Sequence, residues 1–297
     1  MSNPNGNTYV NAAVTMGTFD GVHRGHQLLI KRLRADAALS NLSSVIVTLE
    51  RPVRHVPGLL TPLEEKITLL RQFGVDEILV VPVEPAIIAM PALVFFDEVI
   101  RERLHARHIV IGENFTFGHN REGTPAWLRR HCPEYRIKVD VIETRRFAGE
   151  IISSSRIRRL VIDGNVSAVH RLLGRWYSIE GCHVSGRRIG RTLGFPTVNI
   201  RPDNGKLLPV GVFAVLVESD RLLPGVLNIG SRPTFEHKGD ILPELHIIDY
   251  NGQWRRHRVK VHLVARLRNE KKFEDPAALK RQIERDVAGA RALLNVS

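Results

Sequence analysis

Short apolar runs recur through the first half of the chain, and they are almost continuous rather than alternating with polar residues. Such runs are typical of parallel strands that are covered on both faces of a sheet. We therefore expect strands at residues 10–16, 44–49, 77–83 and 108–112.

Helical periodicity fills the gaps between these runs. The stretch 61–74 opens with Thr61-Pro62-Leu63-Glu64, which reads as a capping box with proline at the first helical position, and it closes at Gly74. Strand–helix alternation predicts an α/β fold with a doubly wound parallel sheet. A second helix is expected over 91–104, with one apolar face made by Leu93, Phe96, Val99, Ile100 and Leu104.

The pattern changes after about residue 175. Short β-type runs now alternate with Gly and Pro, which predicts a small antiparallel barrel or sandwich. These runs are WYSIEGCHV, VGVFAVLV, GVLNIG, ELHIIDY and VKVHLVARL. A long helix should follow from Asp275-Pro276, packing through Leu279, Ile283, Val287, Ala290 and Leu294. We therefore expect two domains, 1–174 and 175–297, joined by a helical zone at 155–173.

Composition narrows the functional classes. No apolar run reaches the roughly 18 residues of a membrane span, and the N-terminus has no basic or apolar signal region, so we expect neither a membrane partner nor secretion. Cys132 and Cys182 are far apart, which argues against a zinc or disulfide framework and favours the cytoplasm.

The net charge of +12 is compatible with nucleic acid, a generally basic surface or polyanionic small molecules such as nucleotides. Because no block of five like charges occurs, small phosphates are favoured and a nucleic-acid partner is not expected.

The densest candidate site is MGTFDGVHRGH at residues 16–26, which follows the first strand and therefore lies where open α/β sheets bind ligands. Gly17, Gly21 and Gly25 allow close approach of a ligand, and the next helix offers N–H groups to an anion. His23 and His26 lie three apart and can donate to phosphate oxygens. A capping or core histidine and a metal pair are the alternatives, but no third ligand is near. The spacing matches neither a P-loop nor a dinucleotide fingerprint.

Two further segments could grip phosphates. The serines of Ile152–Arg158 can cap a helix while Arg156 and Arg158 supply donors, although a plain cap with surface arginines explains it equally well. In 186–199, glycines and arginines could wrap a polyphosphate, and Thr197 and Asn199 are alternate oxygen ligands suited to Mg²⁺. A basic loop that turns at Pro196 is the alternative.

Taken in order, these motifs resemble the prokaryotic bifunctional riboflavin kinase/FAD synthetases. The strand with G-x-F-D-G-V-H-x-G-H resembles their nucleotidylyltransferase module, as do Gly112–Gly118 and Ile152–Arg158. G-R-x-L-G-F-P-T-x-N, N-I-G-S-R-P-T-F, E-x-H and L-R-N-E are similar to their kinase module. The resemblance implies two reactions with ATP as co-substrate, in which riboflavin is phosphorylated to FMN and FMN is adenylylated to FAD with release of pyrophosphate.

The resemblance also implies site residues. In the first domain, catalysis is expected from His23 and His26, nucleotide binding from Gly17, Phe19, Asp20, Gly25, Ser154, Ser155 and Arg158, and flavin binding from Asn114 and Phe117. In the second domain, Glu244 is the expected base, although alone it would read as a surface carboxylate. The remaining assignments are Mg²⁺ at Thr197 and Asn199, nucleotide at Gly190, Arg191 and Gly194, and flavin at Arg268.

One segment and one further residue depart from the family pattern. Leu49-Glu50-Arg51-Pro52-Val53 stands where the adenylyltransferase module usually reads F-x-P-H-P, and Ser155 replaces a threonine. Two alternatives therefore stay open. The chain could be a riboflavin kinase with an impaired adenylyltransferase domain, or a non-catalytic regulator that binds flavin or nucleic acid.

Overall fold

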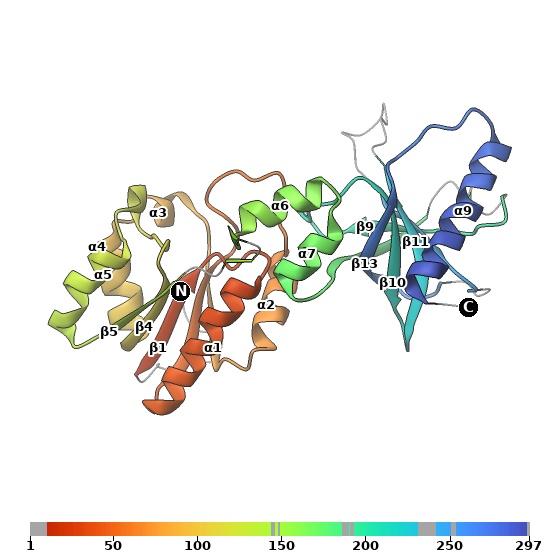
Figure 1. Ribbon diagram of the computed structural model, residues 1–297. Coiled ribbons are helices and arrows are strands. Elements are labelled where there is room, and N and C mark those ends of the chain that lie inside the picture. Colours follow the sequence, from red (N-terminus) through yellow and green to blue (C-terminus); the bar gives the residue numbers. More distant parts are fainter. Residues whose placement is uncertain are drawn as a thin grey trace. The chain divides into compact units, whose positions relative to one another are not determined.

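The computed structural model describes residues 11–143, 146–147, 149–185, 190, 193–230, 242–250 and 254–295. The chain divides into two compact units, Met1–Ser154 and Ser155–Ser297, each of which is described by itself (Figure 1). In these ranges no helix combines the length and the apolar character that crossing a membrane requires.

The first unit is built on a parallel sheet, as predicted. Its described strands pair in the order β3-β2-β1-β4-β5, and every pairing is parallel. The edge strand β5 was not expected, because its residues are only half-buried and do not form an apolar run. The strands are β1 (Ala12–Gly17), β2 (Ser43–Leu49), β3 (Glu77–Val81), β4 (Ala106–Gly112) and β5 (Lys138–Ile142).

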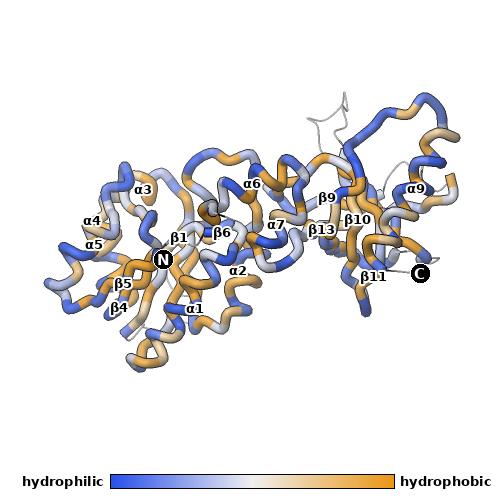
Figure 2. The backbone as a smooth tube through the Cα atoms, in the orientation of Figure 1, coloured by the Kyte–Doolittle hydropathy of each residue, from blue (hydrophilic) through white to orange (hydrophobic). Residues whose placement is uncertain are grey.

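Helices cover both faces of this sheet, which confirms the doubly wound architecture. Helices α1 (Arg24–Leu39) and α2 (Leu63–Arg71) pack on one face, around Ala13, Ile46 and Val110. The neighbouring strand residues point to the other face, where α4 (Ala92–Phe95), its continuation Phe96–Arg103 and α5 (Pro125–His131) pack. Figure 1 shows the two groups of helices apart, with the strands between them, and Figure 2 shows β4 and β5 as apolar stretches. Shorter elements are α3 (Pro85–Ile88), His119–Arg121, Cys132–Tyr135, β6 (Arg146–Phe147) and β7 (Glu150–Ile151).

Two local predictions in this unit are wrong. The expected apolar face of 91–104 holds at Phe96, Ile100 and Leu104, but Leu93 is 50% exposed. The helix begins at Ala92 and widens to π-type winding from Phe96, which shifts the phase of its buried face. The capping box also does not form. The Thr61 hydroxyl accepts from Gly21 N–H and donates to the Asp20 carboxylate, and the helix begins at Leu63 without a side-chain cap.

The second unit contains a closed antiparallel barrel, as one of the two predicted alternatives. Its described strands follow the order β10-β11-β12-β9-β8-β13. Figure 2 shows β10 and β11 as mostly apolar. Strand β9 was expected only as an extended segment. The strands are β8 (Tyr177–Val184), β9 (Val198–Pro202), β10 (Gly211–Glu218), β11 (Leu222–Ile229), β12 (Glu244–Ile247) and β13 (Arg258–Arg268).

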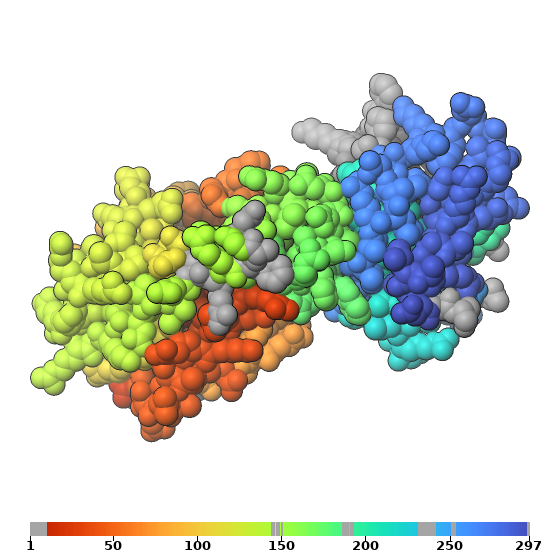
Figure 3. Space-filling view, in the orientation of Figure 1, coloured from red at the N-terminus to blue at the C-terminus, as the bar shows by residue number. Residues whose placement is uncertain are grey.

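In the described part of this unit, helices α6 (Ser154–Ile162), α7 (Val166–Leu173) and α9 (Pro276–Leu294) accompany the barrel. Helix α9, capped by the Asp275 side chain, lies along one side of the barrel (Figure 3) and packs through Val287, Ala290 and Leu294 as predicted. Helices α6 and α7 form the expected helical zone, and α7 packs on β8 and β13. The helical pair therefore belongs with the barrel by packing, whereas the boundary predicted from sequence lies at its other end, at 174/175. That boundary stays a prediction about functional modules.

The turn at Gly118 gives a test of how tightly the loop after β4 is fixed. Its φ is +76°, and a Cβ built there would lie 2.6 Å from the Ala92 backbone. Gly149 has a similar φ of +79° with no atom within 4 Å. We expect Gly149→Ala to lower the free energy of unfolding by about 1 kcal/mol through strain alone. Gly118→Ala should cost roughly 3 kcal/mol because the clash adds to the strain. Urea unfolding of both variants measures the difference, and equal losses would contradict a close-packed turn.

Candidate functional site

The two predicted histidines lie together at the start of α1. His23 is the N-cap residue, and its Nδ1 accepts from the backbone N–H of His26 at 3.3 Å. The two imidazole rings are stacked, with centroids 3.6 Å apart. Because Nδ1 of His23 is an acceptor, the neutral ring carries its proton on Nε2, which is thus a donor. The pair sits at the positive end of a 16-residue helix, where an anion is favoured.

The loop between β1 and α1 holds an unusual backbone. Phe19, Gly21 and Val22 all have positive φ, at 51°, 86° and 37°. This is unfavourable for Phe19 and Val22, so the surrounding contacts must impose it. Gly17 and Gly25 have another use, because an added Cβ would lie 3.2 Å from the rings of Phe19 and His23, respectively. The predicted glycines therefore let aromatic rings pack closely against this loop, and only Gly21 supplies the turn.

Asp20 is one of the groups that impose this conformation. Its side chain is buried, and its oxygens accept from Leu60 N–H at 3.2 Å and from Thr61 N–H at 2.9 Å. These contacts tie the loop to the segment before α2. The nucleotide contact predicted for Asp20 stays a prediction, since the contacts described here are structural.

Ser154 joins the same loop. Its hydroxyl donates to the Asp20 carbonyl at 2.8 Å, across 134 positions of sequence. Ser155 and Arg158 follow on α6, in the second unit, and Arg158 is buried there. The structure thus brings Ser154 to the loop between β1 and α1, residues 18–23, which we call the histidine loop. The nucleotide contacts of Ser155 and Arg158 remain predictions.

The predicted flavin-side loop follows β4, the strand next to β1. Phe117 packs into an aromatic group, with ring centroids 5.8 Å from Phe95, 5.7 Å from Phe115 and 5.5 Å from Trp127. Asn114 is exposed. Since β1 and β4 are adjacent and parallel, the loops that follow them leave the same edge of the sheet. They do so at the topological switch point, where successive strands begin to be added on the other side of β1.

Sequence reasoning missed Lys66, which lies beneath this edge. Its ammonium group is buried and donates to carbonyls at the ends of β1 and β2. Burial lowers the pKa of Lys66 to about 8, against the opposing effect of Asp20 and Glu50. A single lysine on an amphipathic helix carries no signal that distinguishes it from a solvated one.

In the barrel, strand register assembles the predicted base and one metal ligand. Glu244 on β12 pairs directly with Asn199 on β9 and, on its other side, with Asn228 on β11. Directly opposed residues share one face of a sheet, with Cβ atoms about 5 Å apart. We call these three residues the polar row. Asn199 is 7% exposed. Asn228 belongs to the N-I-G-S-R-P-T-F motif, and the strand register places it opposite Glu244, which the sequence alone does not indicate.

The polar row lies on the outer face of the barrel, the side on which α9 packs against β10, β11 and β13. Val226, two positions from Asn228, and Val212, opposite Asn228, both pack with Ala290 of α9. His246, two positions from Glu244, donates its Nδ1–H to the Pro196 carbonyl at 3.0 Å, so β12 also fixes the turn before Thr197. Thr197 is half-buried.

The predicted nucleotide glycines of the barrel lie just before this turn. Gly190 accepts from Phe195 N–H at 2.8 Å, and an added Cβ would lie 2.3 Å from the Phe195 carbonyl oxygen. Gly194 has a φ of +89° in open space. Arg191 lies outside the described residues.

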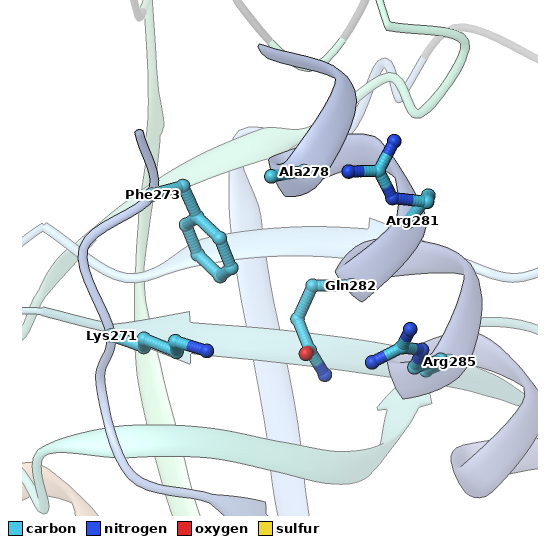
Figure 4. A pocket seen from close by; sticks show the side chains of 6 residues that line it. All are labelled: Lys271, Phe273, Ala278, Arg281, Gln282 and Arg285. Carbon is cyan, nitrogen blue, oxygen red and sulfur yellow. The ribbon is translucent and has the colours of Figure 1, made fainter. Parts of the chain in front are cut away.

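Arg268, the predicted flavin contact, is tied to α9. Its guanidinium makes hydrogen bonds of 2.8–3.0 Å with the buried Asp286 carboxylate. Beside it lies a recess of about 160 Å³. In Figure 4, Lys271 and Arg285 point toward Gln282 from opposite sides, below the ring of Phe273. The residues that line the recess also include Ala278 and Arg281, but no member of the polar row. The recess is therefore a cationic surface separate from the polar row.

One group of possible metal ligands lies elsewhere in the described part of the first unit. Ligand atoms of Asp36, His108 and Asp140 lie within 4.8 Å of one another. Arg32 lies 2.7 Å from Asp36, and Lys138 lies 3.0 Å from Asp140. Because cations already neutralise both carboxylates, this group acts as an ion network that ties α1 to β4 and β5.

Comparison with known proteins gives two family matches in order along the chain. Residues 7–156 match FAD synthetase, and residues 173–294 match riboflavin kinase. The "Bifunctional riboflavin kinase/FMN adenylyltransferase" of Escherichia coli (strain K12) is 34% identical over 293 residues, covering 96% of this chain and 93% of the relative. The protein of the same name from Haemophilus influenzae is 34% identical over 292 residues, covering 95% and 94%.

A solved structure has the same fold over nearly the whole length. It is described as "Crystal Structure of Macrolide-efflux Protein from Streptococcus pneumoniae", with a TM-score of 0.86, 27% identity, and coverage of 95% of this chain and 94% of that one. Both family matches and relatives above 30% identity span nearly all of the sequence, and the chain therefore belongs to the bifunctional riboflavin kinase/FMN adenylyltransferase family.

Proposed function

We propose how the two reactions of this family are divided over the residues of this chain. The chain phosphorylates riboflavin to FMN with ATP and adenylylates FMN to FAD. We assign adenylylation to the unit that holds the histidine pair and phosphorylation to the barrel. The assignment depends on the pairing of Asn199 with Glu244 in the barrel. This pairing puts a carboxylate beside an amide whose oxygen can bind a metal ion.

In adenylylation, an oxygen of the FMN phosphate attacks the α-phosphorus of ATP. The bond from that phosphorus to the bridging oxygen breaks, and pyrophosphate leaves. Negative charge grows on the non-bridging oxygens, so the Nε2–H of His23, the ring of His26 and the N-terminus of α1 stabilise the transition state. We propose that Ser154, Ser155 and Arg158 hold the phosphates and that Asn114 and Phe117 contact the flavin.

In phosphorylation, the Glu244 carboxylate takes the proton of the primary ribityl hydroxyl as that oxygen attacks the γ-phosphorus of ATP. ADP then leaves. The Asn199 amide and the Thr197 hydroxyl are hard oxygen donors, and they fit Mg²⁺. When bound there, Mg²⁺ would neutralise charge on the transferred phosphate. Glycines 190 and 194, with Arg191, would face the nucleotide, and Arg268 would lie near the flavin.

We also propose a cytoplasmic location, where riboflavin, FMN and ATP are the partners. The support is that Cys132 and Cys182 are both free thiols and that the cell interior is reducing.

The division of labour predicts opposite defects from two substitutions. Glu244→Gln removes the base and should lower FMN formation by roughly 10²–10⁴-fold while sparing FAD formation from supplied FMN. His26→Ala should lower FAD formation by about 10²–10³-fold while sparing the kinase. Chromatography of products from riboflavin with ATP, and separately from FMN with ATP, measures both. Joint loss of both activities in either folded variant would contradict the assignment.

The same experiment decides whether the altered 49–53 segment has impaired the first unit. The native chain should form FAD from FMN and ATP above a control without enzyme. A chain that forms FMN but no FAD is a kinase alone.

The oxygen donors of the barrel predict a specific metal requirement. Asn199→Ala should raise the Mg²⁺ concentration for half-maximal FMN formation by about tenfold or more, because a ligand is lost. FAD formation by the same variant is the internal control and should keep its Mg²⁺ dependence. An unchanged Mg²⁺ requirement of the kinase reaction would remove Asn199 from the metal site.

A further inference from the structure

We propose that Lys66 is a positioning residue of the adenylyltransferase site, where its ammonium group joins the carbonyl ends of β1 and β2 and offsets their negative charge beneath the ATP phosphates. The inference rests on the assignment of adenylylation to the first unit. It adds a residue that makes no predicted contact with substrate and acts through the loop that carries His23 and His26.

The contacts of Lys66 converge from two strands. It lies on α2 and is 2% exposed. Its Nζ donates to the carbonyls of Thr18 at 3.2 Å and Glu50 at 3.3 Å, and most closely to that of Leu49. Thr18 immediately precedes the strained part of the loop, and Leu49 is the last residue of β2. One side chain therefore fixes the loop relative to the neighbouring strand.

These carbonyls would otherwise oppose the chemistry of the site. The carboxyl edge of a parallel sheet exposes carbonyl groups, whose oxygens carry partial negative charge, and a triphosphate must bind at this edge. The Thr48 hydroxyl also donates to the Thr18 carbonyl, at 3.1 Å, but a neutral donor adds no net charge. Only Lys66 among these contacts supplies a full positive charge.

Packing alone does not explain an ammonium group here. Burying a charge costs free energy that an apolar side chain of similar length would avoid. The groups that act on it are the carboxylates of Asp20, from the loop after β1, and Glu50, from the end of β2. A charge is retained despite its cost, which is the pattern expected where charge serves binding.

The titration of Lys66 separates a role in binding from a role in stability. Burial lowers its pKa from 10.5 to about 8. Between these values the unfolded chain holds a proton that the folded chain has lost, so the contribution of Lys66 to stability increases as pH rises. In the folded chain the cation itself is lost as pH rises through about 8. Stability and ATP binding should therefore respond to alkaline pH in opposite directions.

The experiment measures FAD formation from FMN and ATP by the full chain, and the KM for ATP, below and above pH 8. The native KM should increase as pH rises through the titration of Lys66. Lys66→Met should have a KM for ATP about tenfold higher below that pH and no further rise above it, as expected for loss of a charge-assisted interaction. Lys31→Met, at an exposed lysine of α1, is the matched control and should behave as the native chain. FMN formation should be unchanged in both variants.

Each other result has a defined meaning. A native KM that stays flat through the titration, or a Lys66→Met variant with the native KM and pH dependence, overturns the inference while the proposed function stands. A native chain that makes no FAD overturns the proposed function, and the role of Lys66 with it. If Lys66→Met fails to fold, the native pH profile and Lys66→Arg decide. The arginine keeps its charge at these pH values, and its KM should not rise.

Discussion

The first unit depends on one constraint: carbonyl groups and N–H groups of the backbone must meet at a single edge of the sheet. Strand β1 ends with carbonyl groups at the carboxyl edge of the sheet, and after six intervening residues α1 begins with N–H groups that have no partner within the helix. The chain makes this change through three positive φ angles, two of them at Phe19 and Val22. Strain of this kind persists only where surrounding contacts impose it, and those contacts come from Asp20, Thr61, Ser154 and Lys66.

In the barrel, the pairing register of the strands places the polar row. The polar row comes from three strands whose order in sequence is β9, β11 and β12, yet pairing places its members directly opposite one another. A slip of one residue in β12 would send Glu244 to the apolar interior and bring Leu245 to the row. The apolar alternation that buries Leu245 and Ile247 therefore also aims the carboxylate.

Sequence patterns predicted the fold class, the helical zone and the packing face of α9, because each depends on periodicity or on short motifs that can be recognised locally. They missed β5, whose half-buried residues have no apolar run. They also misplaced Leu93, because π winding changes the phase of a helix without altering its composition. At the site, spacing paired His23 with His26, but it could not show that Thr61 serves the histidine loop rather than α2. That choice depends on a contact across 40 positions, which no local pattern encodes.

Backbone and side-chain contacts hold the first residues of the segment 49–53, which departs from the family pattern. Glu50 N–H donates to the Val81 carbonyl at 2.9 Å, which extends the pairing with β3, and the Arg51 guanidinium donates to the Val83 carbonyl at 3.2 Å. Lys66 holds the carbonyls of Leu49 and Glu50. The path of residues 49–51 is therefore fixed by backbone groups and by two cations, Lys66 and Arg51, and Arg51 is itself one of the residues that depart from the family pattern. The same lysine holds the Thr18 carbonyl, so the substituted segment and the loop before His23 share one cation. Arg51 stands where the family pattern has a proline, so the substitution adds a guanidinium group, and this group ties the end of β2 to the chain that follows β3.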